Sequence, residues 1–146
     1  MNKLLILAVA MTIILSACGQ QQGAGASDTQ ALVKAWISAY ESKDADKYIS
    51  LYSDDIYYAD WAIGAFINGK DGWSSGVRST FPEEGFGVKV TSYFISSDGR
   101  FAAVECIYSD KDRQGRIVSM PMVSILEFKD GKIVKETDYY DAGALR

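Results

Sequence analysis

The sequence predicts an α+β domain in which N-terminal helices cover a curled antiparallel sheet. Apolar residues recur at helical spacing between Leu32 and Tyr52. From Ile56 onward, runs rich in β-branched and aromatic residues are separated by turn signals such as Asp98-Gly99 and Asp130-Gly131. With 146 residues, the chain is long enough for one domain with a single hydrophobic core.

The first residues have the pattern of an export signal. Asn2 and Lys3 form a short basic region, and the run from Leu4 to Leu15 is apolar and uncharged. At about 1.5 Å per residue this run spans only ~18 Å, well short of a hydrocarbon core of ~30 Å, so a membrane-spanning helix is disfavoured. We therefore expect a cleavable signal peptide.

The segment Leu15-Ser16-Ala17-Cys18 resembles the bacterial lipobox. In a lipobox, signal peptidase cuts before the cysteine, which receives a diacylglyceryl thioether with acyl chains such as palmitate. The resemblance implies that residues 1–17 are a lipoprotein signal peptide and that the lipid on Cys18 anchors the protein at the extracytoplasmic face of a bacterial cell membrane. A secreted protein with a chance cysteine is the alternative. The polar, glycine-rich residues 18–27 predict a flexible tether, and residues 28–146 form the expected domain.

Composition excludes several kinds of site and partner. The sequence has no histidine, which excludes Ser-His-Asp and Cys-His catalysis and argues against a zinc site, and we expect no metal and no cofactor. Acidic residues outnumber basic ones by 19 to 15, which argues against nucleic acid as a partner. If Cys18 carries a lipid, Cys106 has no intramolecular disulfide partner. Because Cys106 lies in an apolar strand pattern, we interpret it as a buried structural thiol rather than a nucleophile.

Three helices are expected around the start of the sheet. Ser27-Asp28-Thr29-Gln30 has the form of a capping box and predicts the start of the first helix. The apolar face of this helix is expected to consist of Leu32, Val33, Trp36, Ile37 and Tyr40. Asp44 is expected to cap a second, shorter helix, whose buried side carries Tyr48, Ile49, Leu51 and Tyr52. Asp71 is expected to cap a third helix, from Gly72 to about Thr80.

Strands account for most of the remaining chain, with a loop or irregular strand from Ala62 to Lys70. The predicted strands are Ile56–Trp61, Gly87–Ser96, Phe101–Tyr108, Ile117–Phe128 and Ile133–Asp141. Alternation assigns one apolar set to the concave side under the helices, namely Ala102, Val104, Cys106, Tyr108, Val118, Met120, Met122, Leu126 and Phe128. In the last strand the alternation is ambiguous, because two sets compete. They are Val134, Glu136, Asp138 and Tyr140 against Ile133, Lys135, Thr137, Tyr139 and Asp141.

The order helix, helix, strand, helix and four antiparallel strands resembles the nuclear transport factor 2-like superfamily, and within it the SnoaL-like group. The residues on which this resemblance rests are Asp44, Leu51-Tyr52-Ser53-Asp54-Asp55, Asp130-Gly131-Lys132-Ile133 and Tyr139-Tyr140-Asp141. The resemblance covers about Asp28 to Ala142. It implies a cone-shaped cystatin-like fold, in which a strongly bent sheet wraps one long helix and leaves an apolar pocket open at one end. Members include isomerases, cyclases, dehydratases and proteins without chemistry, so the fold does not determine the function.

The resemblance to steroid isomerases of this superfamily places Asp60 at the position of the catalytic base. Their first strand carries Asp-Asp, four further residues and then the catalytic Asp, and here Asp54-Asp55 is followed by Ile56-Tyr57-Tyr58-Ala59 and Asp60. An aspartate in an apolar pocket can have a pKa raised toward neutrality, and it can then move a proton next to a carbonyl. The same comparison places Trp36 where these enzymes carry a tyrosine as oxyanion donor. The indole N–H can donate a hydrogen bond, but it is bulkier and a weaker acid than a phenol.

Further residues are candidates for the same pocket. Asp138 lies on the last strand, where SnoaL-like cyclases are expected to carry an acid–base carboxylate, and it joins Asp60 as a candidate catalytic residue. The alternatives are that Asp60 only ends a strand and that Asp138 faces solvent. The candidate ligand-binding residues, which are otherwise core residues, are Trp36, Tyr40, Tyr58, Met120, Met122 and Tyr140.

Three functions are consistent with these observations. We rank first a membrane-tethered extracytoplasmic domain that binds a small, mostly apolar molecule. The second is a cofactor-independent isomerase, cyclase or dehydratase with Asp60 as general base. The third is a protein-interaction module in the cell envelope, and a pocket volume of ~300–1,000 Å³ would favour the first two over it. Tyr57 and Trp61, if they lie on the outer face of the sheet, predict a homodimer through that face, as is common in the superfamily.

Overall fold

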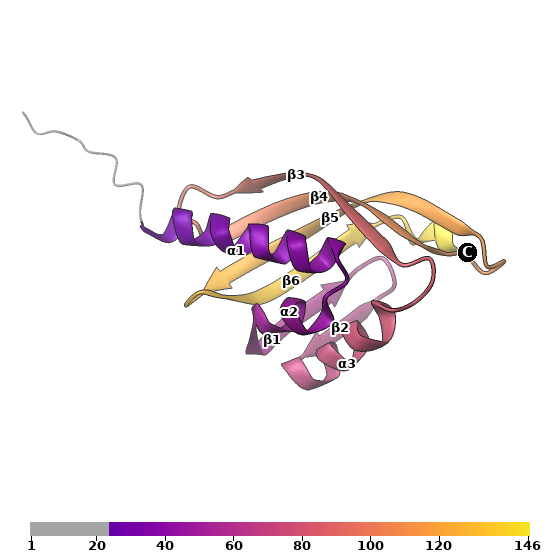
Figure 1. Cartoon of the computed structure of the whole chain (residues 1–146), viewed down its shortest axis with the longest axis horizontal. Coiled ribbons are helices and arrows are strands. Elements are labelled where there is room, and N and C mark those ends of the chain that lie inside the picture. Colours follow the sequence, from indigo (N-terminus) through magenta and orange to yellow (C-terminus); the bar gives the residue numbers. More distant parts are fainter. Residues whose placement is uncertain (1–23) are drawn as a thin grey trace, which may run out of the picture.

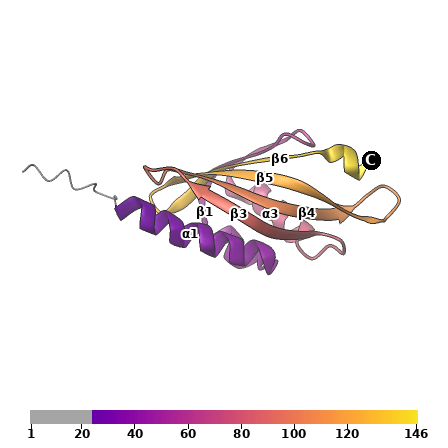
Figure 2. The same cartoon turned by 90° about the horizontal axis from the view of Figure 1, so that it is seen from above.

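The computed structural model describes residues 24–146, so the expected signal peptide and Cys18 lie outside the described residues. The described chain is a six-stranded sheet with a long helix, α1, along one face and two shorter helices beside the sheet edge formed by residues 52–68 (Figures 1 and 2). The predicted α+β class is therefore confirmed. Among the described helices, none has the length and apolar character needed to cross a membrane.

Within residues 24–146 there are three α-helices: α1 at Ala24–Glu41, α2 at Ala45–Ser50 and α3 at Lys70–Thr80. The capping-box prediction for α1 was wrong, because the helix begins before Ser27. Thr29 inside it donates a hydrogen bond to Gly99 O at 2.7 Å, so a tertiary contact holds this end of the helix. Asp44 caps α2 as predicted, because its Oδ1 accepts from Lys47 N at 3.0 Å. The N-cap of α3 is Gly69 without a side-chain hydrogen bond, so the predicted cap, Asp71, lies in the first turn instead.

The sheet has the strand order β2-β1-β6-β5-β4-β3. Its strands are β1 Tyr52–Asp60, β2 Ala65–Asn68, β3 Gly87–Ile95, β4 Phe101–Lys111, β5 Ile117–Lys129 and β6 Lys132–Tyr140. Neighbours are antiparallel except β1 and β6, which are parallel. β1 begins at Tyr52 rather than at the predicted Ile56, because Tyr52 pairs with Ile133 and Ile133 N donates to Leu51 O at 3.0 Å. The parallel pair brings the first and last strands of the domain side by side.

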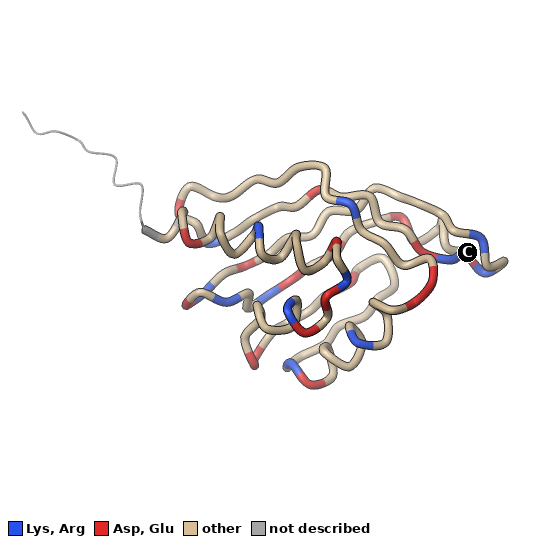
Figure 3. Tube along the Cα trace, viewed as in Figure 1, with Lys and Arg blue, Asp and Glu red and all other residues tan. Residues whose placement is uncertain are grey.

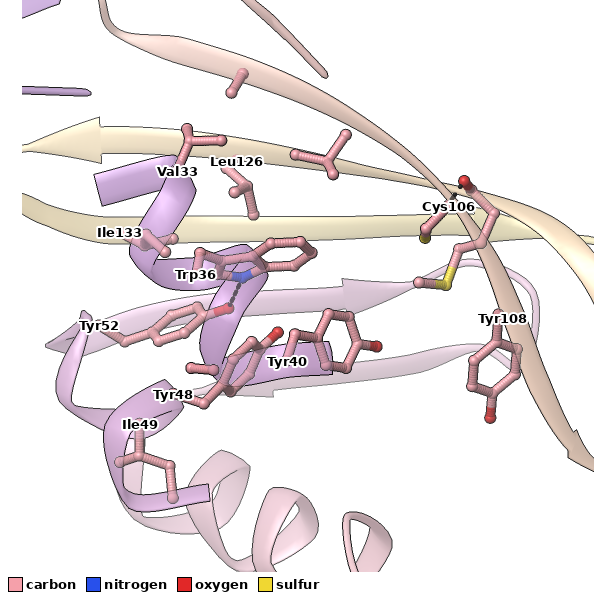
Figure 4. Close-up of a cluster of buried hydrophobic side chains, with 14 of the residues drawn as sticks. Val33, Trp36, Tyr40, Tyr48, Ile49, Tyr52, Cys106, Tyr108, Leu126 and Ile133 are labelled. Carbon is pink, nitrogen blue, oxygen red and sulfur yellow. Dashed lines mark hydrogen bonds between the residues drawn. The ribbon is translucent and has the colours of Figure 1, made fainter. Parts of the chain in front are cut away.

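The hydrophobic core lies between α1 and the concave face of the sheet (Figure 4). Trp36 is fully buried there, and its Nε1 donates to the Tyr52 hydroxyl at 2.6 Å. The predicted concave set is confirmed, because its members are buried and only Val118 is partly buried. The buried members are Ala102, Val104, Cys106, Tyr108, Met120, Met122, Leu126 and Phe128.

A bulge explains the ambiguous alternation of β6. Phe128 pairs with Ile133 but Glu127 pairs with Lys135, so Val134 is the extra residue. The bulge changes which parity faces inward, because Ile133 is buried before it and Glu136 is buried after it. β6 therefore contributes an apolar residue to the core at one end and polar residues to the concave side at the other.

The convex face of the sheet carries exposed apolar side chains. They include Phe94 at 63%, Ile117 at 61% and Tyr139 at 50%, and Trp61, which directly follows β1, is 60% exposed. Tyr57 is partly buried on this face, where the Lys135 ammonium lies 5.6 Å from its ring centroid. Basic and acidic positions are scattered along the trace rather than collected on one side (Figure 3).

Candidate functional site

A pocket of about 380 Å³ opens between the helices and the concave face, next to β1 and β6. Aromatic side chains form a large part of its walls. They are Tyr40, Tyr48, Tyr58, Trp73, Phe81, Phe86, Tyr108 and Tyr140. The rings are packed against one another, since the Phe81 centroid lies 5.6 Å from that of Tyr40 and 5.2 Å from that of Phe86. Most of these rings therefore contact at least one other ring of the same wall.

Three buried carboxyl groups line the same pocket. Asp60 ends β1, while Glu136 and Asp138 lie on β6, and their exposed fractions are 4%, 1% and 3%. The parallel register pairs Asp60 with Asp138 and Tyr58 with Glu136. Alternate residues of one strand point to the same side, so the two strands place these four side chains together on the concave face.

Hydrogen bonds run diagonally between the two strands. The Tyr58 hydroxyl donates to Asp138 Oδ2 at 2.9 Å, and the Tyr140 hydroxyl donates to Asp60 Oδ2 at 2.9 Å. Ser124 on β5 donates to Asp138 Oδ1 at 2.5 Å. Burial raises the pKa of Tyr58 and of Tyr140 well above the ordinary tyrosine range, and the nearby carboxylates add to the effect. Both phenols therefore remain protonated donors at neutral pH.

Asp60 also has a structural role at the end of β1. Its Oδ1 accepts from the backbone N–H groups of Ala62 and Ile63 at 2.9 and 3.2 Å. Asp60 therefore ends the strand, which was the structural alternative for this residue. It also lines the pocket, and its carboxylate accepts three hydrogen bonds.

Glu136 lies deeper, at the end of a chain of hydrogen bonds from the core. Trp36 donates to the Tyr52 hydroxyl, which in turn donates to Glu136 Oε2. The Tyr48 hydroxyl donates to Glu136 Oε1 at 3.1 Å. Burial is the main cause that raises the pKa of Glu136 well above its ordinary value, and the negative charge of Asp138 adds to it.

Asp138 has a raised pKa of about 6, again chiefly because burial disfavours its charged form. The neighbouring Asp60 charge acts in the same direction, while the hydrogen bonds from Ser124 and Tyr58 oppose it. Asp138 therefore changes its charge close to neutral pH, where proton transfer and pH-dependent binding are both possible. Its position excludes the alternative that it faces solvent.

The structure divides the predicted site residues into two groups. The pocket lining includes Asp60, Asp138, Tyr40, Tyr58, Met122 and Tyr140. Trp36 and Met120 are buried in the core and are not part of the lining. The Trp36 N–H is directed at Tyr52 and not at the pocket. Cys106 is buried, donates to Met122 O at 3.6 Å and has a pKa that burial raises to about 12, as a structural thiol would.

Sequence reasoning missed two parts of the lining. Glu136 was not predicted as a site residue, because the alternation of the last strand did not show which side faces inward. The available signal was its position two residues before Asp138, which places both side chains on one face of a regular strand. Phe81 and Phe86 lie at the two ends of a segment that was predicted to be a turn. Their aromatic side chains were the only indication in the sequence that they could be buried. Both rings fold back onto Tyr40 and enclose the pocket.

The Tyr40 hydroxyl has no hydrogen-bond partner among the described residues, and its residue is only 7% exposed. Tyr40 lines the pocket, and Figure 4 shows its hydroxyl directed away from Tyr52 and toward the side on which Tyr108 lies. This hydroxyl is available to a bound molecule.

All the charged residues that line the pocket are acidic. Its lining contains Asp60, Glu83, Asp110, Glu136 and Asp138, and within the described chain no lysine or arginine belongs to it. No ion pair of the described residues involves Asp60, Glu136 or Asp138. Among residues 24–146, no three Asp, Glu, Cys or His side chains are grouped so as to hold a metal ion.

Comparison with known proteins identifies the fold. A family model described as a SnoaL-like domain matches residues 33–136. No curated protein sequence matches the chain significantly. Many solved structures are similar, and all those described below superpose over most of both chains.

Three of these structures illustrate the range. A protein from Catenulispora acidiphila with a ketosteroid isomerase-like fold, in complex with trimethylamine, is 24% identical over 78% of this chain and 88% of its own, with a TM-score of 0.64. An NTF-2 like protein of unknown function from Burkholderia xenovorans is 28% identical over 81% and 86%, with a TM-score of 0.64. An LEH-like epoxide hydrolase from M. tuberculosis is 21% identical over 82% and 87%, with a TM-score of 0.69.

Proposed function

The chain belongs to the SnoaL-like domain family, and on this basis we propose that it is a binding protein for a small, mostly apolar molecule. The observation that carries the proposal is the pocket of about 380 Å³ with aromatic walls and polar groups gathered on β1 and β6. Ligand sites typically enclose ~300–1,000 Å³ and combine apolar walls with a few polar groups that orient the ligand. An interaction module whose pocket is filled by side chains would not need this volume.

The proposed location is the extracytoplasmic face of a bacterial membrane. Support comes from the sequence alone, because the uncharged run Leu4 to Leu15 precedes the lipobox-like segment that ends at Cys18. A lipid on Cys18 would hold the domain close to the membrane through the polar residues that follow.

A pocket-filling variant tests the binding proposal. Gly76 on α3 lines the pocket, and a Cβ at this position has no heavy atom within 4 Å, so Gly76→Trp can fill the opening without a backbone clash. Native mass spectrometry of the full-length chain, before and after denaturation, is expected to show a co-purified small molecule in the wild type and its loss in Gly76→Trp. Ser75→Trp, on the same helix but outside the lining, is the control and should retain the molecule. Equal occupancy in both variants, or none in the wild type, would contradict the proposal.

A second candidate function is cofactor-independent proton transfer, as in an isomerase, cyclase or dehydratase. Asp60 and Asp138 are paired across adjacent strands, and the pKa of Asp138 is about 6, so one carboxyl can hold a proton while the other accepts one. Asp60 is the candidate base. The candidate donor to a substrate carbonyl is the free Tyr40 hydroxyl, because the Trp36 N–H is bonded to Tyr52.

Asp60→Asn distinguishes catalysis from binding. The amide keeps the shape of the carboxylate but cannot accept a proton, so an enzyme is expected to lose about 100-fold or more in turnover and to accumulate its substrate. The measurement is the identity and amount of the small molecule that co-purifies with Asp60→Asn, compared with the wild type by native mass spectrometry. The same molecule in the same amount would argue against a catalytic Asp60 and leave the binding function in place.

The convex face supports a further proposal, that two copies associate through their sheets. Phe94 is directly opposite Ala103 on this face and is 63% exposed. Phe94→Glu places a charge in the proposed interface, and we expect the dimer dissociation constant to rise at least about tenfold. Ile63→Glu is the control, because Ile63 is 62% exposed but borders the pocket. Analytical ultracentrifugation would contradict the proposal if the wild type sediments as a monomer or if both variants behave alike.

A further inference from the structure

We propose that the pocket selects an organic cation, a small amine or quaternary ammonium with an apolar substituent, and holds its positive charge beside Asp60 and Asp138. The inference rests on the proposed binding function, because it specifies the class of ligand for the same pocket. It follows from four features of the lining: its uncompensated carboxyl groups, their hydrogen bonds, its aromatic walls and the free Tyr40 hydroxyl.

The carboxyl groups in the pocket have no positive partner in the described chain. Asp60 and Asp138 are 4% and 3% exposed, and neither takes part in an ion pair among the described residues. An unpaired charge in such surroundings is costly, and an opposite charge that is well placed and hydrogen-bonded offsets part of that cost. The Lys43 ammonium lies 5.6 Å from the Phe86 centroid, but Lys43 does not line the pocket.

The hydrogen bonds favour the ionised form of both aspartates. Every polar contact of their carboxyl oxygens comes from a donor: backbone N–H groups and Tyr140 for Asp60, Ser124 and Tyr58 for Asp138. A carboxylate has about four lone-pair directions, so each still has room to accept from a ligand. With a pKa of about 6, Asp138 is mostly ionised at neutral pH.

The aromatic walls favour an organic cation over a hydrated metal ion. Faces of tyrosine, tryptophan and phenylalanine attract an ammonium group within about 6 Å of the ring centroid, and their apolar surface also buries its substituents. Tyr40, Phe81 and Phe86 form a continuous wall of this kind in the same pocket that Asp138 lines. A strongly hydrated inorganic ion would gain little from such a wall.

The Tyr40 hydroxyl is the independent sign of a ligand. Tyr40 is only 7% exposed. Its hydroxyl faces the pocket and has no hydrogen-bond partner among the described residues (Figure 4). A phenol oxygen can accept a hydrogen bond from an ammonium N–H or donate one to a ligand oxygen.

The balance of donors and acceptors separates a cation from a neutral carbonyl compound. The Tyr58 and Tyr140 hydroxyls already donate to Asp138 and Asp60, so neither phenol beside these carboxylates is free to donate to a carbonyl ligand. Such a ligand would depend on the Tyr40 and Thr80 hydroxyls, which also line the pocket. An ammonium ligand would find unused acceptor capacity on both carboxylates. The pocket is therefore better matched to a donor that carries positive charge.

The test compares three probes of similar size and different charge on the full-length chain. They are phenethylammonium, the neutral phenethyl alcohol and the anionic phenylacetate, each titrated by isothermal calorimetry near neutral pH. We expect phenethylammonium to bind at least about tenfold more tightly than the alcohol, and phenylacetate to bind most weakly. In Asp138→Asn the preference for the cation over the alcohol should shrink at least about fivefold, whereas Asp46→Asn, an exposed control on α2, should leave it unchanged.

Each outcome separates this inference from the binding function. If phenethyl alcohol binds as tightly as the cation in the wild type, the inference is wrong but the pocket still binds small molecules. If none of the probes binds and Gly76→Trp also carries the same co-purified molecule as the wild type, both proposals fail. Should Asp138→Asn not fold, Tyr40→Phe provides a second variant, and we expect it to weaken the binding of phenethylammonium severalfold.

Discussion

Replacement of Trp36 by alanine is expected to lower the free energy of unfolding by about 3–5 kcal/mol. The indole is fully buried between α1 and the sheet, where its ring contacts those of Tyr40 and Tyr48 at centroid distances of 4.9 and 5.8 Å. Truncation leaves a cavity and also removes the N–H that donates to the Tyr52 hydroxyl. Urea unfolding followed by circular dichroism measures the change.

The matched control is the same substitution at an exposed tryptophan. Trp61 is 60% exposed, and Trp61→Ala is expected to change the free energy of unfolding by no more than about 0.5 kcal/mol. Both variants are best measured on the Phe94→Glu background, so that association through the convex face does not contribute. Trp36→Phe keeps most of the ring but loses the hydrogen bond, and about 1–2 kcal/mol is expected. Similar losses for Trp36→Ala and Trp61→Ala would contradict the core assignment.

A pH-dependent loss of stability is the second large effect, and it comes from Asp138. Burial raises the pKa of Asp138 to about 6 in the folded protein, whereas an unfolded aspartate has a pKa of about 4. The folded state therefore binds this proton more tightly. The resulting stabilisation is fully present below about pH 4 and is lost as the pH rises through about 6. At about 1.4 kcal/mol per unit of pKa, the loss amounts to about 2–3 kcal/mol.

Asp138→Asn removes this contribution because the amide does not titrate. Urea unfolding across the range from about pH 4 to pH 7 should show the wild type losing about 2–3 kcal/mol relative to Asp138→Asn. Asp112→Asn is the control, because the pKa of Asp112 is shifted in the opposite direction. Hydrogen bonds from Arg116 lower the pKa of Asp112, so its stabilisation persists across this range and is lost only at lower pH. A difference between wild type and Asp138→Asn that does not vary with pH would show that Asp138 does not titrate there.

Local signals predicted most of the fold. Asp44 caps a helix because its short carboxylate can reach the N–H of Lys47, and this depends only on neighbouring residues. Asp130-Gly131 forms a tight turn because both residues adopt positive φ, at 52° and 73°, which this pair tolerates. Alternation in β4 and β5 identified the buried face because both strands are regular along most of their length.

Predictions failed where a distant contact decided the local structure. Tyr52 reads as the end of a helix, but pairing with Ile133 draws it into β1. The bulge at Val134 depends on how β6 pairs with β5, so no pattern within β6 itself could reveal it. That bulge turns both Glu136 and Asp138 inward, whereas the resemblance that placed Asp138 in the predicted site gave no reason to include Glu136.

The sequence by itself determined the fold class, the family resemblance and the presence of Asp60, Asp138 and several tyrosines as pocket candidates. These follow from periodicity and from residue types at fixed spacing, which are local properties of a chain. Only the tertiary structure decided which candidates meet. It pairs Asp60 with Asp138 across a parallel pair of strands, leaves the Tyr40 hydroxyl facing the pocket and turns the Trp36 N–H into the core. Such juxtapositions depend on register and packing between distant segments, and it is these that give the pocket its negative, aromatic character.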